Sequence, residues 1–586
     1  LTGTALTLTN TDQIGKSSFN QTNDSGSLAS ANWSNGQWPT YINDYFTGTN
    51  TLRTPSGVGD VIFPGGSLTL QNPFGLYFKG NSGSKVTISN LILTNGGGVC
   101  QALNSSTAFT LEGNLTVAGG QFYNSGDATR SITNATTMSG SGPLTNTGAG
   151  LVVYTDNNSA FTGPLIVNSN TTLQASSQNN LGGDPAVFND DQLLLDNGAF
   201  QPTASFALNN PHSGVTIGVN GGTFNIAAGL TLTISNPISG AGNLFSLGGG
   251  TLFLATSNNA TGNLIVSNST LKLIGNASLK NFLLGVSNNA TLDVTALSIP
   301  LAVSNRIALA GNLIVNCNST NTSSRLSASN VVYGGTLTLS NSGPAFAAGN
   351  SFTLFAASNY SGAFTGINPA TPGSGFVWDA SKLAVSGMIQ VSQPPTVNVT
   401  PVSTNVIYGN IVVLAANVTG TGPLSYQWYD NHTNTIAGAV YSSFTNTPAV
   451  AGNGNYSVVV TNSVGRATNF ASLNISKALL TVTADITNRP YGTPNPVLTG
   501  SLMGIQNGDI ITATYVSPAA ASSPAGNYVI APVLNDPSSR LPNYVVTTNL
   551  GTLTVTLASN PTNLTSSVNG MNLTLTWPMT HLGWTL

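Results

Sequence analysis

The sequence predicts an all-β protein, with stacked coils of short β-strands up to about residue 391 and compact β-sandwiches after it. Apolar residues alternate with Thr, Ser and Asn over short runs, which is the period-two pattern of half-buried strands. Gly, Asn and Pro interrupt these runs at short intervals, as tight turns require. Good helix formers such as Glu and Lys are scarce, and no long segment carries apolar residues with the helical period.

A recurring phrase marks the chain up to residue 391. It opens with Gly-Gly-Thr followed by Leu or Phe, continues as a short alternating strand, and breaks at Asn, Ser or Gly. One copy of such a unit cannot bury its apolar face alone, whereas stacked copies can. The phrase therefore predicts a parallel β-helix, or solenoid, with Leu, Ile and Val inside and Asn at the turns. The clearest copies stand at 221–224, 249–252 and 334–339, and looser strand copies at 109–111, 165–167, 264–266 and 313–315.

The composition argues against several classes of protein. Charged residues make up 5% of the 586 residues and apolar residues 40%, so the chain is too hydrophobic for ordinary disorder. The net charge of -3 offers no basic surface for phosphates, and we expect no binding to nucleic acid. No apolar run of about 18 residues is present, so no transmembrane segment is expected. Leu1 begins the chain without a signal-peptide pattern, and we expect a removed leader or a processed fragment.

Aromatic residues gather in the opening of the solenoid region, which spans residues 1–391. A stack of strands needs its open end covered, so these residues predict a packed N-terminal cap. Exposed aromatic rings can also stack on sugars, and this alternative stays open. The residues concerned are Trp33, Trp38, Tyr41, Tyr45 and Phe46.

The segment around Pro394 and Pro395 predicts a linker, because proline cannot donate a hydrogen bond to a strand ladder. Residues 392–476 then predict a compact sandwich with Trp428 in its core and Tyr456 as a corner tyrosine. This segment resembles bacterial immunoglobulin-like domains. It departs from them in lacking the usual disulfide, because Ala416 and Val458 stand about where the two cysteines would be.

Residues 477–556 carry strand motifs in an order that resembles the MBG-type β domains of bacterial surface proteins. The motifs stand at 480–484, 489–492, 526–528, 542–544 and 551–555. Residues 557–586 form a partial β segment with two expected strands, at 564–565 and 573–577. Such a segment is too short for an independent sandwich, so we expect it to continue further or to be completed by another chain.

Two longer phrases carry a third resemblance. Residues 238–244 with 249–252, and 139–144 with 148–151, are similar to the passenger-associated β-strand repeats of autotransporter-type proteins. The resemblance covers much of residues 1–391. It implies a right-handed parallel β-helix, secretion and display at the cell surface, with the sandwich domains as stalk or spacer modules.

The titratable residues do not form a recognisable catalytic motif. Glu112 is the sole glutamate and has no neighbouring histidine, and the three histidines, His212, His432 and His581, fall in different predicted modules. We therefore predict that the protein is not an enzyme, with no catalytic, cofactor-binding or metal-binding residues and no cofactor. The densest acidic cluster, formed by Asp184, Asp190, Asp191 and Asp196, is interpreted as a solvated turn before a strand; a calcium or catalytic site is the alternative.

Cys100 and Cys317 have no metal-ligand spacing. We interpret both as small apolar fillers and leave a disulfide between them open.

The sequence therefore predicts a secreted structural or adhesive protein, extracellular or at the cell surface. Few charges and open strand edges suit self-association, and pairing of the C-terminal strands with residues 1–10 of a neighbour would build an extracellular filament. The alternative function is a polysaccharide-binding or polysaccharide-cleaving β-helix protein. The predicted partners are further copies of the chain and surface glycans or polysaccharide.

Overall fold

The computed structural model describes residues 39–41, 44–48, 51–54, 59–101, 108–124, 129–279, 283–557 and 565–576. The chain divides into two compact units, Leu1–Ser392 and Gln393–Leu586. The all-β prediction is confirmed: the α-helices of the described residues are two four-residue segments, α1 (Gln178–Leu181) and α2 (Leu383–Ser386). The predicted succession of a parallel β-solenoid and β-sandwiches is also confirmed.

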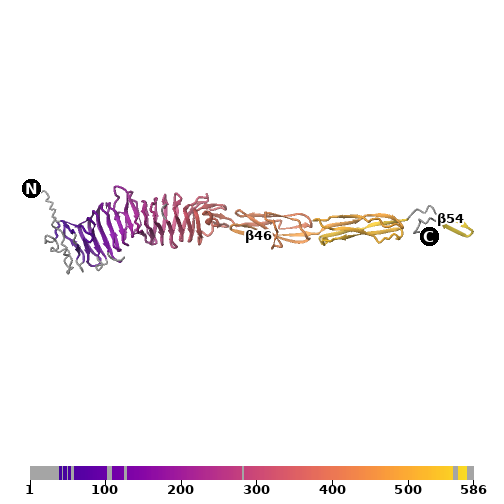
Figure 1. Ribbon diagram of the computed structural model, residues 1–586, viewed down its shortest axis with the longest axis horizontal. Helices are drawn as coiled ribbons and strands as arrows, with labels where there is room; N and C mark the ends of the chain where they lie inside the picture. Colours follow the sequence, from indigo (N-terminus) through magenta and orange to yellow (C-terminus); the bar gives the residue numbers. More distant parts are fainter. Residues whose placement is uncertain are drawn as a thin grey trace. The chain divides into compact units, whose positions relative to one another are not determined.

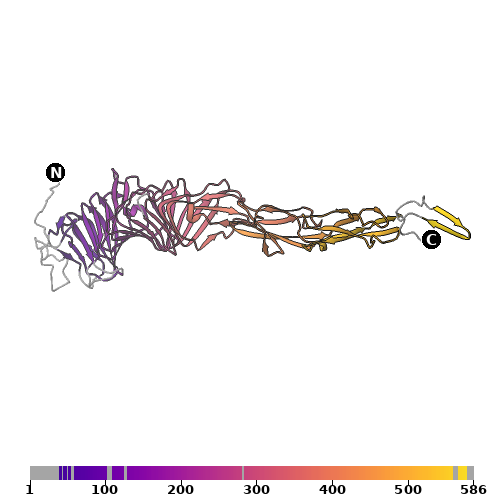
Figure 2. The same ribbon diagram turned by 45° about the vertical axis from the view of Figure 1, so that its right-hand side comes forward.

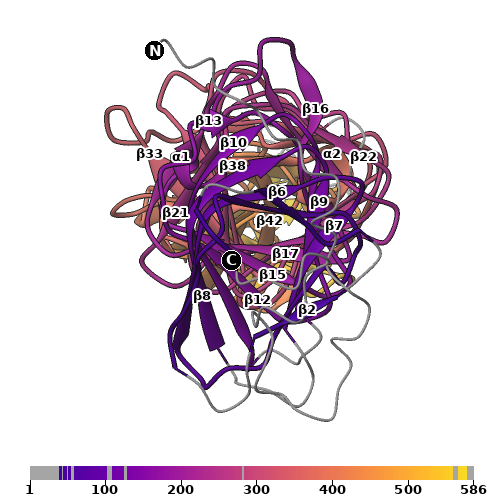
Figure 3. The same cartoon turned by 90° about the vertical axis from the view of Figure 1, so that its left-hand side faces the viewer.

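The first unit is a parallel β-solenoid of about 12 turns, with coils that follow one another along its length (Figure 1). Its described strands form three parallel sheets around a common interior, as the view along the coils shows (Figure 3). The first solenoid sheet contains β1 (Asp44–Phe46), β3 (Val61–Phe63), β4 (Ser67–Leu70), β6 (Ser84–Leu93), β8 (Ala108–Val117), β10 (Ser131–Gly140), β12 (Leu151–Tyr154), β13 (Ala160–Phe161), β15 (Thr172–Ala175), β17 (Gly198–Pro202), β20 (Gly222–Asn225), β23 (Leu244–Leu247), β25 (Asn263–Val266), β27 (Leu283–Val286), β29 (Leu301–Ala302), β30 (Arg306–Leu309), β32 (Leu326–Tyr333) and β35 (Phe355–Gly362).

The other two sheets complete the coil. The second solenoid sheet contains β2 (Leu52–Arg53), β5 (Leu76–Phe78), β7 (Gly97–Gln101), β9 (Gly120–Asn124), β11 (Leu144–Thr147), β14 (Leu165–Asn168), β16 (Asn189–Asp196), β19 (Ser213–Ile217) and β22 (Ile238–Gly240). The third solenoid sheet contains β18 (Phe206–Leu208), β21 (Thr231–Ile234), β24 (Thr251–Leu254), β26 (Thr270–Gly275), β28 (Thr291–Leu297), β31 (Asn312–Cys317), β33 (Thr336–Asn341) and β36 (Gly366–Asn368).

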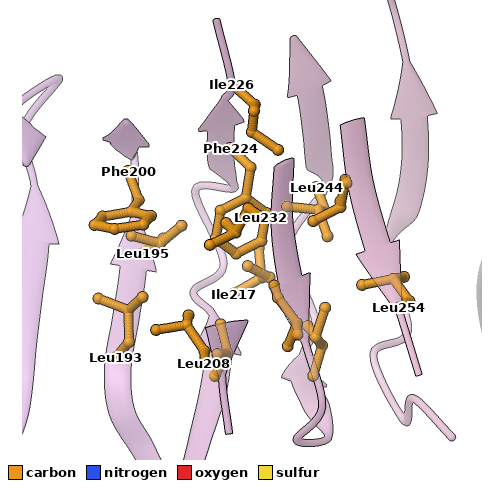
Figure 4. Close-up of a cluster of buried hydrophobic side chains, with 14 of the residues drawn as sticks. Leu193, Leu195, Phe200, Leu208, Ile217, Phe224, Ile226, Leu232, Leu244 and Leu254 are labelled. Carbon is orange, nitrogen blue, oxygen red and sulfur yellow. The ribbon is translucent and has the colours of Figure 1, made fainter. Parts of the chain in front are cut away.

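Apolar side chains of one strand position stack on each other through the solenoid interior. The clearest column lies in the third solenoid sheet, where each leucine is paired in register with that of the next coil and none is exposed. Burial of each such leucine contributes about 1.5–3 kcal/mol relative to exposure. Figure 4 shows the interior near Phe200 and Phe224, which also occupy successive coils. The leucine column of the third solenoid sheet consists of Leu232, Leu252, Leu271, Leu292, Leu313 and Leu337.

Glycines form the corners between sheets. Gly140 and Gly240 both have a φ of +102°, and a Cβ atom on either would lie 2.3 Å or 2.0 Å from the carbonyl oxygen of the preceding coil. The phrases at 139–144 and 238–244 therefore bend the chain in the same way, but at different corners of the coil. The strand after Gly140 is β11 of the second solenoid sheet, whereas the strand after Gly240 is β23 of the first.

The last coils pack against a small antiparallel sheet of β34 (Ser351–Thr353), β37 (Val377–Asp379) and β38 (Met388–Ser392). Phe346 makes edge-on contacts with Phe352 and Trp378, at ring-centroid distances of 5.5 and 5.4 Å. This aromatic cluster covers the apolar interior at the end of the solenoid.

The second unit contains two successive β-sandwiches (Figure 2). The first sandwich has Trp428 in its core with no exposed surface, and the indole N–H donates to the carbonyl of Tyr441 at 2.9 Å. The hydroxyl of Tyr456 accepts a 2.6 Å bond from the side chain of Asn446. Its strands are β39 (Thr396–Thr400), β41 (Val412–Thr419) and β44 (Ser443–Asn446) in one sheet, and β40 (Ser403–Ile407), β46 (Gly465–Ser476), β45 (Gly452–Asn462), β42 (Ser425–Asp430) and β43 (Asn434–Thr435) in the other.

The second sandwich follows after a single connecting residue, Lys477. One sheet contains β49 (Gly500–Met503), β47 (Ala478–Ala484) and β52 (Tyr544–Asn549), and the other β48 (Thr487–Pro490), β53 (Gly551–Thr556), β51 (Gly526–Asn535) and β50 (Thr512–Val516). The 3₁₀ helix η3 (Leu541–Asn543) precedes β52, and the hairpin of β54 (Thr565–Asn569) and β55 (Asn572–Thr576) comes last. The predicted pairing of this end with residues 1–10 involves residues that lie outside the described ones.

Candidate functional surfaces

The acidic cluster predicted from the sequence does not converge on one point. Asp184 and His212 form a surface pair in which Oδ2 of Asp184 lies 2.8 Å from Nδ1 of His212. The other carboxylate oxygen accepts the backbone N–H of His212 at 2.9 Å. Partial desolvation of Asp184 disfavours its charged form, but the bonds from His212 outweigh this effect and lower the pKa of the carboxyl. The pair therefore ties together the loops before β16 and β19.

The remaining acidic residues have separate local roles. Asp190 and Asp191 are exposed within β16, where pairing with β19 shifts register, rather than in the turn that the sequence predicted. A regular strand would point one of two neighbouring side chains inward. The bulge in β16 allows both carboxylates to stay in solvent. Asp196 binds the backbone N–H of Asn220 at 2.8 Å and the Asn220 amide at 3.1 Å. Within the described ranges, no three His, Cys, Asp or Glu side chains are grouped as metal ligands.

The two other histidines and the two cysteines do not join the acidic cluster either. The ring of His432 meets Phe470 edge-on at 4.9 Å in the first sandwich, and His581 lies outside the described residues. Cys100 and Cys317 are both buried free thiols, which agrees with their interpretation as apolar fillers. Burial raises the pKa of Cys317 to about 12 and that of Cys100 further.

The predicted N-terminal aromatic cap is described only in part. Tyr45 is fully buried, and its ring meets Phe63 edge-on at 5.6 Å, which fits a packed role. Phe46 is half-buried, whereas Tyr41 is 83% exposed and is not packed into a cap. Trp33 and Trp38 lie outside the described residues.

Two buried asparagines connect successive coils, and the sequence patterns did not reveal them. Oδ1 of Asn158 accepts the backbone N–H of Met138 at 2.8 Å, and its amide donates to the carbonyl of Asn180 at 2.7 Å. Asn258 repeats this arrangement with the N–H of Ile238, at 2.9 Å, and the carbonyl of Ser278, at 3.3 Å. Each asparagine thus bridges the coil before it and the coil after it. The signal was present in the sequence, because both precede a Thr-Gly corner and a Leu-Ile-Val strand.

The outer surface of the third solenoid sheet carries a small ladder of side chains that are neighbours in register. Phe253, Lys272 and Asp293 stand on β24, β26 and β28. The ammonium of Lys272 lies 5.7 Å from the Phe253 ring centroid and 3.0 Å from the Asp293 carboxylate. Its charge is therefore neutralised within the protein.

A second group of residues that sequence reasoning missed joins the two sandwiches. Tyr408 of the first sandwich and Tyr544 of the second are 1% and 3% exposed, and their rings meet edge-on at 5.5 Å. Both hydroxyls donate to the same oxygen of Asp509, Tyr408 at 3.0 Å and Tyr544 at 2.7 Å. The Tyr544 hydroxyl also accepts the backbone N–H of Gln506 at 2.8 Å. We refer to Tyr408, Asp509 and Tyr544 as the tyrosine clamp.

Further contacts surround the tyrosine clamp. The backbone N–H of Ala451 donates to the side chain of Asn543 at 2.9 Å, and the amide of Asn507 donates to the carbonyl of Pro448 at 3.0 Å. Burial raises the pKa of Tyr544 to about 12, and its bond to the Asp509 carboxylate acts in the same direction. The buried apolar residues of the first sandwich continue into those of the second, so the two sandwiches share one core cluster.

One segment of the chain matches a known protein family. Residues 480–554 match the family model of the MBG domain (YGX type). The Tyr-Gly-Thr sequence of this domain, 491–493, follows β48, whose Arg489 is buried and donates through Nε to Asn495 at 2.7 Å. The MBG-type resemblance predicted from the sequence is confirmed for these residues. The autotransporter-type resemblance of the solenoid stays a prediction.

Solved structures with similar segments consist of immunoglobulin-like or fibronectin-like modules. The I-band fragment I67-I69 from titin is 15% identical, with 29% of this chain and 71% of that chain covered and a TM-score of 0.17. The titin domains z1z2 in complex with telethonin are 18% identical, with coverages of 28% and 98% and a TM-score of 0.18. The fibronectin(III)-like modules of Clostridium thermocellum CbhA are 16% identical, with coverages of 28% and 93% and a TM-score of 0.12.

No curated protein matches the chain. None of the described helices has the length and apolar character required to cross a bilayer.

Proposed function

We propose that this chain is a secreted cell-surface protein with a structural or adhesive role. The MBG domain and the immunoglobulin-like sandwich before it support an extracellular location, because such modules are typical of extracellular proteins. In the proposed arrangement the solenoid presents its outer surface to partners, and the two sandwiches act as a spacer.

The tyrosine clamp is the observation that carries this proposal. A spacer transmits position and force only if its modules do not turn freely about their connection. Lys477 alone connects the sandwiches, and two buried tyrosines share one carboxylate oxygen across the junction. Charge-assisted hydrogen bonds of this kind are stronger and more directional than neutral ones. The junction is thus built to hold two modules in one orientation, which is more than a flexible tether needs.

Labelling of intact cells tests the location. Antibodies against the purified chain are applied to the cells that produce it, before and after permeabilisation, with a cytoplasmic protein as the internal control. The proposal expects labelling of intact cells that external protease removes. Labelling that requires permeabilisation would contradict it.

We further propose that the protein assembles into an extracellular fibre. The strands β54 and β55 pair only with each other among the described strands, and Val568 and Leu573 on them are largely exposed. Open edges with exposed apolar side chains are suited to strand addition. Negative-stain electron microscopy of the full chain tests this: filaments are expected, and the variants Val568→Lys and Leu573→Lys should shorten them, whereas Val568→Thr should not. Separate particles at every protein concentration would refute assembly.

A further inference from the structure

An aromatic ridge lies on the outer face of the second solenoid sheet. Tyr77 on β5 and Tyr123 on β9 occupy the same register position two coils apart, with Cys100 between them on β7. The ring of Phe74 lies 6.0 Å from that of Tyr77, stacked, and 5.6 Å from that of Tyr123, edge-on. Phe74 is 42% exposed and both tyrosines are half-buried. Coils are separated by about 4.8 Å, so the three rings cover about 10 Å along the solenoid.

The ridge is held in place by the turn that carries Phe74. Asn72 accepts the backbone N–H of Phe74 at 2.9 Å, which closes the turn. The carbonyl of Pro73 accepts the side-chain amide of Gln121 at 3.0 Å and contacts the thiol of Cys100 at 3.2 Å. A Cβ atom at position 98 would lie 1.9 Å from this carbonyl oxygen, so Gly98 is required for the turn to pack on the sheet. The rings are therefore fixed before any partner binds, which lowers the entropic cost of binding.

Polar groups with unused bonding capacity surround the ridge. The guanidinium of Arg53 lies 5.9 Å from the Tyr77 ring centroid, and no carboxylate of the described residues pairs with it. In the part of the chain that the structure describes, the hydroxyls of Tyr77 and Tyr123 have no hydrogen-bond partner either. This differs from Lys272, which also lies above an aromatic ring, because Asp293 already neutralises Lys272.

We propose that the ridge binds an acidic polysaccharide. Flat aromatic surfaces stack against the C–H faces of sugar rings, tyrosine hydroxyls can bond sugar hydroxyls, and an unpaired arginine forms a bidentate pair with a sugar carboxylate. A chain of sugars suits a ridge that continues over successive coils, whereas a compact ligand would need a pocket. The inference rests on the adhesive function proposed above and names its ligand class.

Equilibrium binding of polygalacturonate to the full-length chain tests the proposal, with uncharged dextran as the comparison polymer. Phe74→Ala removes the central, most exposed ring, and Arg53→Gln removes the charge but keeps most of the side chain. Each should weaken polygalacturonate binding about ten-fold. Lys272→Gln is the matched control, since it also removes a cation above a ring, and it should leave binding unchanged. Circular dichroism and thermal unfolding establish that each variant is folded.

The result expected for wild type is salt-sensitive binding of polygalacturonate and weak or no binding of dextran. Equal affinity for both polymers, or unchanged binding by Phe74→Ala and Arg53→Gln, would overturn the proposal. So would an equal loss in Lys272→Gln. If no polymer binds and Phe74→Ala abolishes self-association instead, the occupant is a second copy of the chain and the proposal is wrong. Purified protein is used throughout, so failure here leaves the cell-surface location to its own test.

Discussion

Asn258 shows how one polar side chain can specify the stacking of coils. Asn258 is 1% exposed, and its side chain bonds backbone groups of the coils on either side. Removal of the side chain would leave the buried N–H of Ile238 without its acceptor, which is costlier than the loss of a solvated bond, whereas the carbonyl of Ser278 would keep the backbone N–H of Asn258. Apolar columns alone allow coils to slip along one another, whereas these directional bonds fix the register.

We predict that Asn258→Leu lowers the free energy of unfolding of the solenoid by about 1–3 kcal/mol. Asn289→Ala is the control, because Asn289 is exposed and its side chain makes no hydrogen bond among the described residues. Its effect should stay within about 0.5 kcal/mol. Urea unfolding followed by circular dichroism measures both. Equal stability of the two variants would show that Asn258 is dispensable for register.

Tyr544 gives the second unit a distinct dependence on alkaline pH. Its pKa is raised from 10.0 to about 12, because its neutral hydroxyl is buried and donates to a carboxylate. A raised pKa means that the folded state holds the proton more tightly, so this contribution to stability is complete below pH 10.0 and is lost as pH rises to about 12.

We therefore predict that the unfolding free energy of the second unit falls between pH 10 and pH 12, and that Tyr544→Phe reduces the slope of this fall. Some fall should remain in the variant, because burial also raises the pKa of Tyr456. Tyr528→Phe is the control, since the Tyr528 hydroxyl donates to the carbonyl of Pro524, not to a carboxylate. Denaturant titrations at a series of pH values provide the slopes. An unchanged slope in Tyr544→Phe would contradict the stated origin.

At the scale of elements, the sequence predicted strands better than it predicted sheets. Alternation located strands such as β14 and β33 because a single strand has one buried side. The Gly-Gly-Thr phrase did not reveal which sheet follows it: β20 belongs to the first solenoid sheet, whereas β24 and β33 belong to the third. The corners are locally equivalent, so a phrase that encodes a corner carries no information about its position around the coil. The turn predicted at Asp190 and Asp191 is absent for a related reason, because β16 pairs with the next coil on both sides of them, at Asn189 and Leu193, and they form the bulge between these pairs.

The corner glycines allow a test that separates backbone strain from steric conflict. Gly240 has positive φ and no space for a Cβ atom, whereas Gly229 has a φ of +82° and no heavy atom within 4 Å of the point that a Cβ atom would occupy. We predict that Gly229→Ala lowers the free energy of unfolding by about 1 kcal/mol, from strain alone. Gly240→Ala should cost at least about 3 kcal/mol, because the coil before it must shift. Urea unfolding of both variants measures the difference, and similar losses would mean that the coils separate easily.

At the scale of the whole molecule, the order of modules was predictable and the contact between the sandwiches was not. The change in composition, the end of the repeats and the proline pair can each be recognised from a short stretch of sequence. The tyrosine clamp joins Tyr408 to Asp509 across 101 positions, and neither residue belongs to a recognisable motif. The aromatic ridge was missed similarly, since Phe74 and Tyr123 meet only after the chain has coiled. Sequence patterns report which residues face inward, but not which outward residues the coiling brings together.

The tyrosine clamp predicts that the two sandwiches are energetically coupled. Tyr544→Phe lies in the second sandwich and leaves one buried oxygen of Asp509 with a single hydroxyl donor, which should cost about 1–3 kcal/mol. If the sandwiches unfold together, part of this loss reaches β42 of the first sandwich, where Trp428 is fully buried. Amide hydrogen exchange by mass spectrometry should then be faster in peptides from β42 as well as from β51.

Tyr528→Phe again provides the comparison, because it removes a tyrosine hydroxyl bond within the second sandwich away from the clamp. This bond is exposed to solvent, so its loss should cost little and leave the exchange of peptides from β42 unchanged. The double variant Tyr408→Phe with Tyr544→Phe should cost less or more than the sum of the single variants, since both hydroxyls bind the same oxygen of Asp509. Strict additivity, together with unchanged exchange in β42, would mean that the sandwiches move independently, and the spacer role proposed for them would then lose its physical basis.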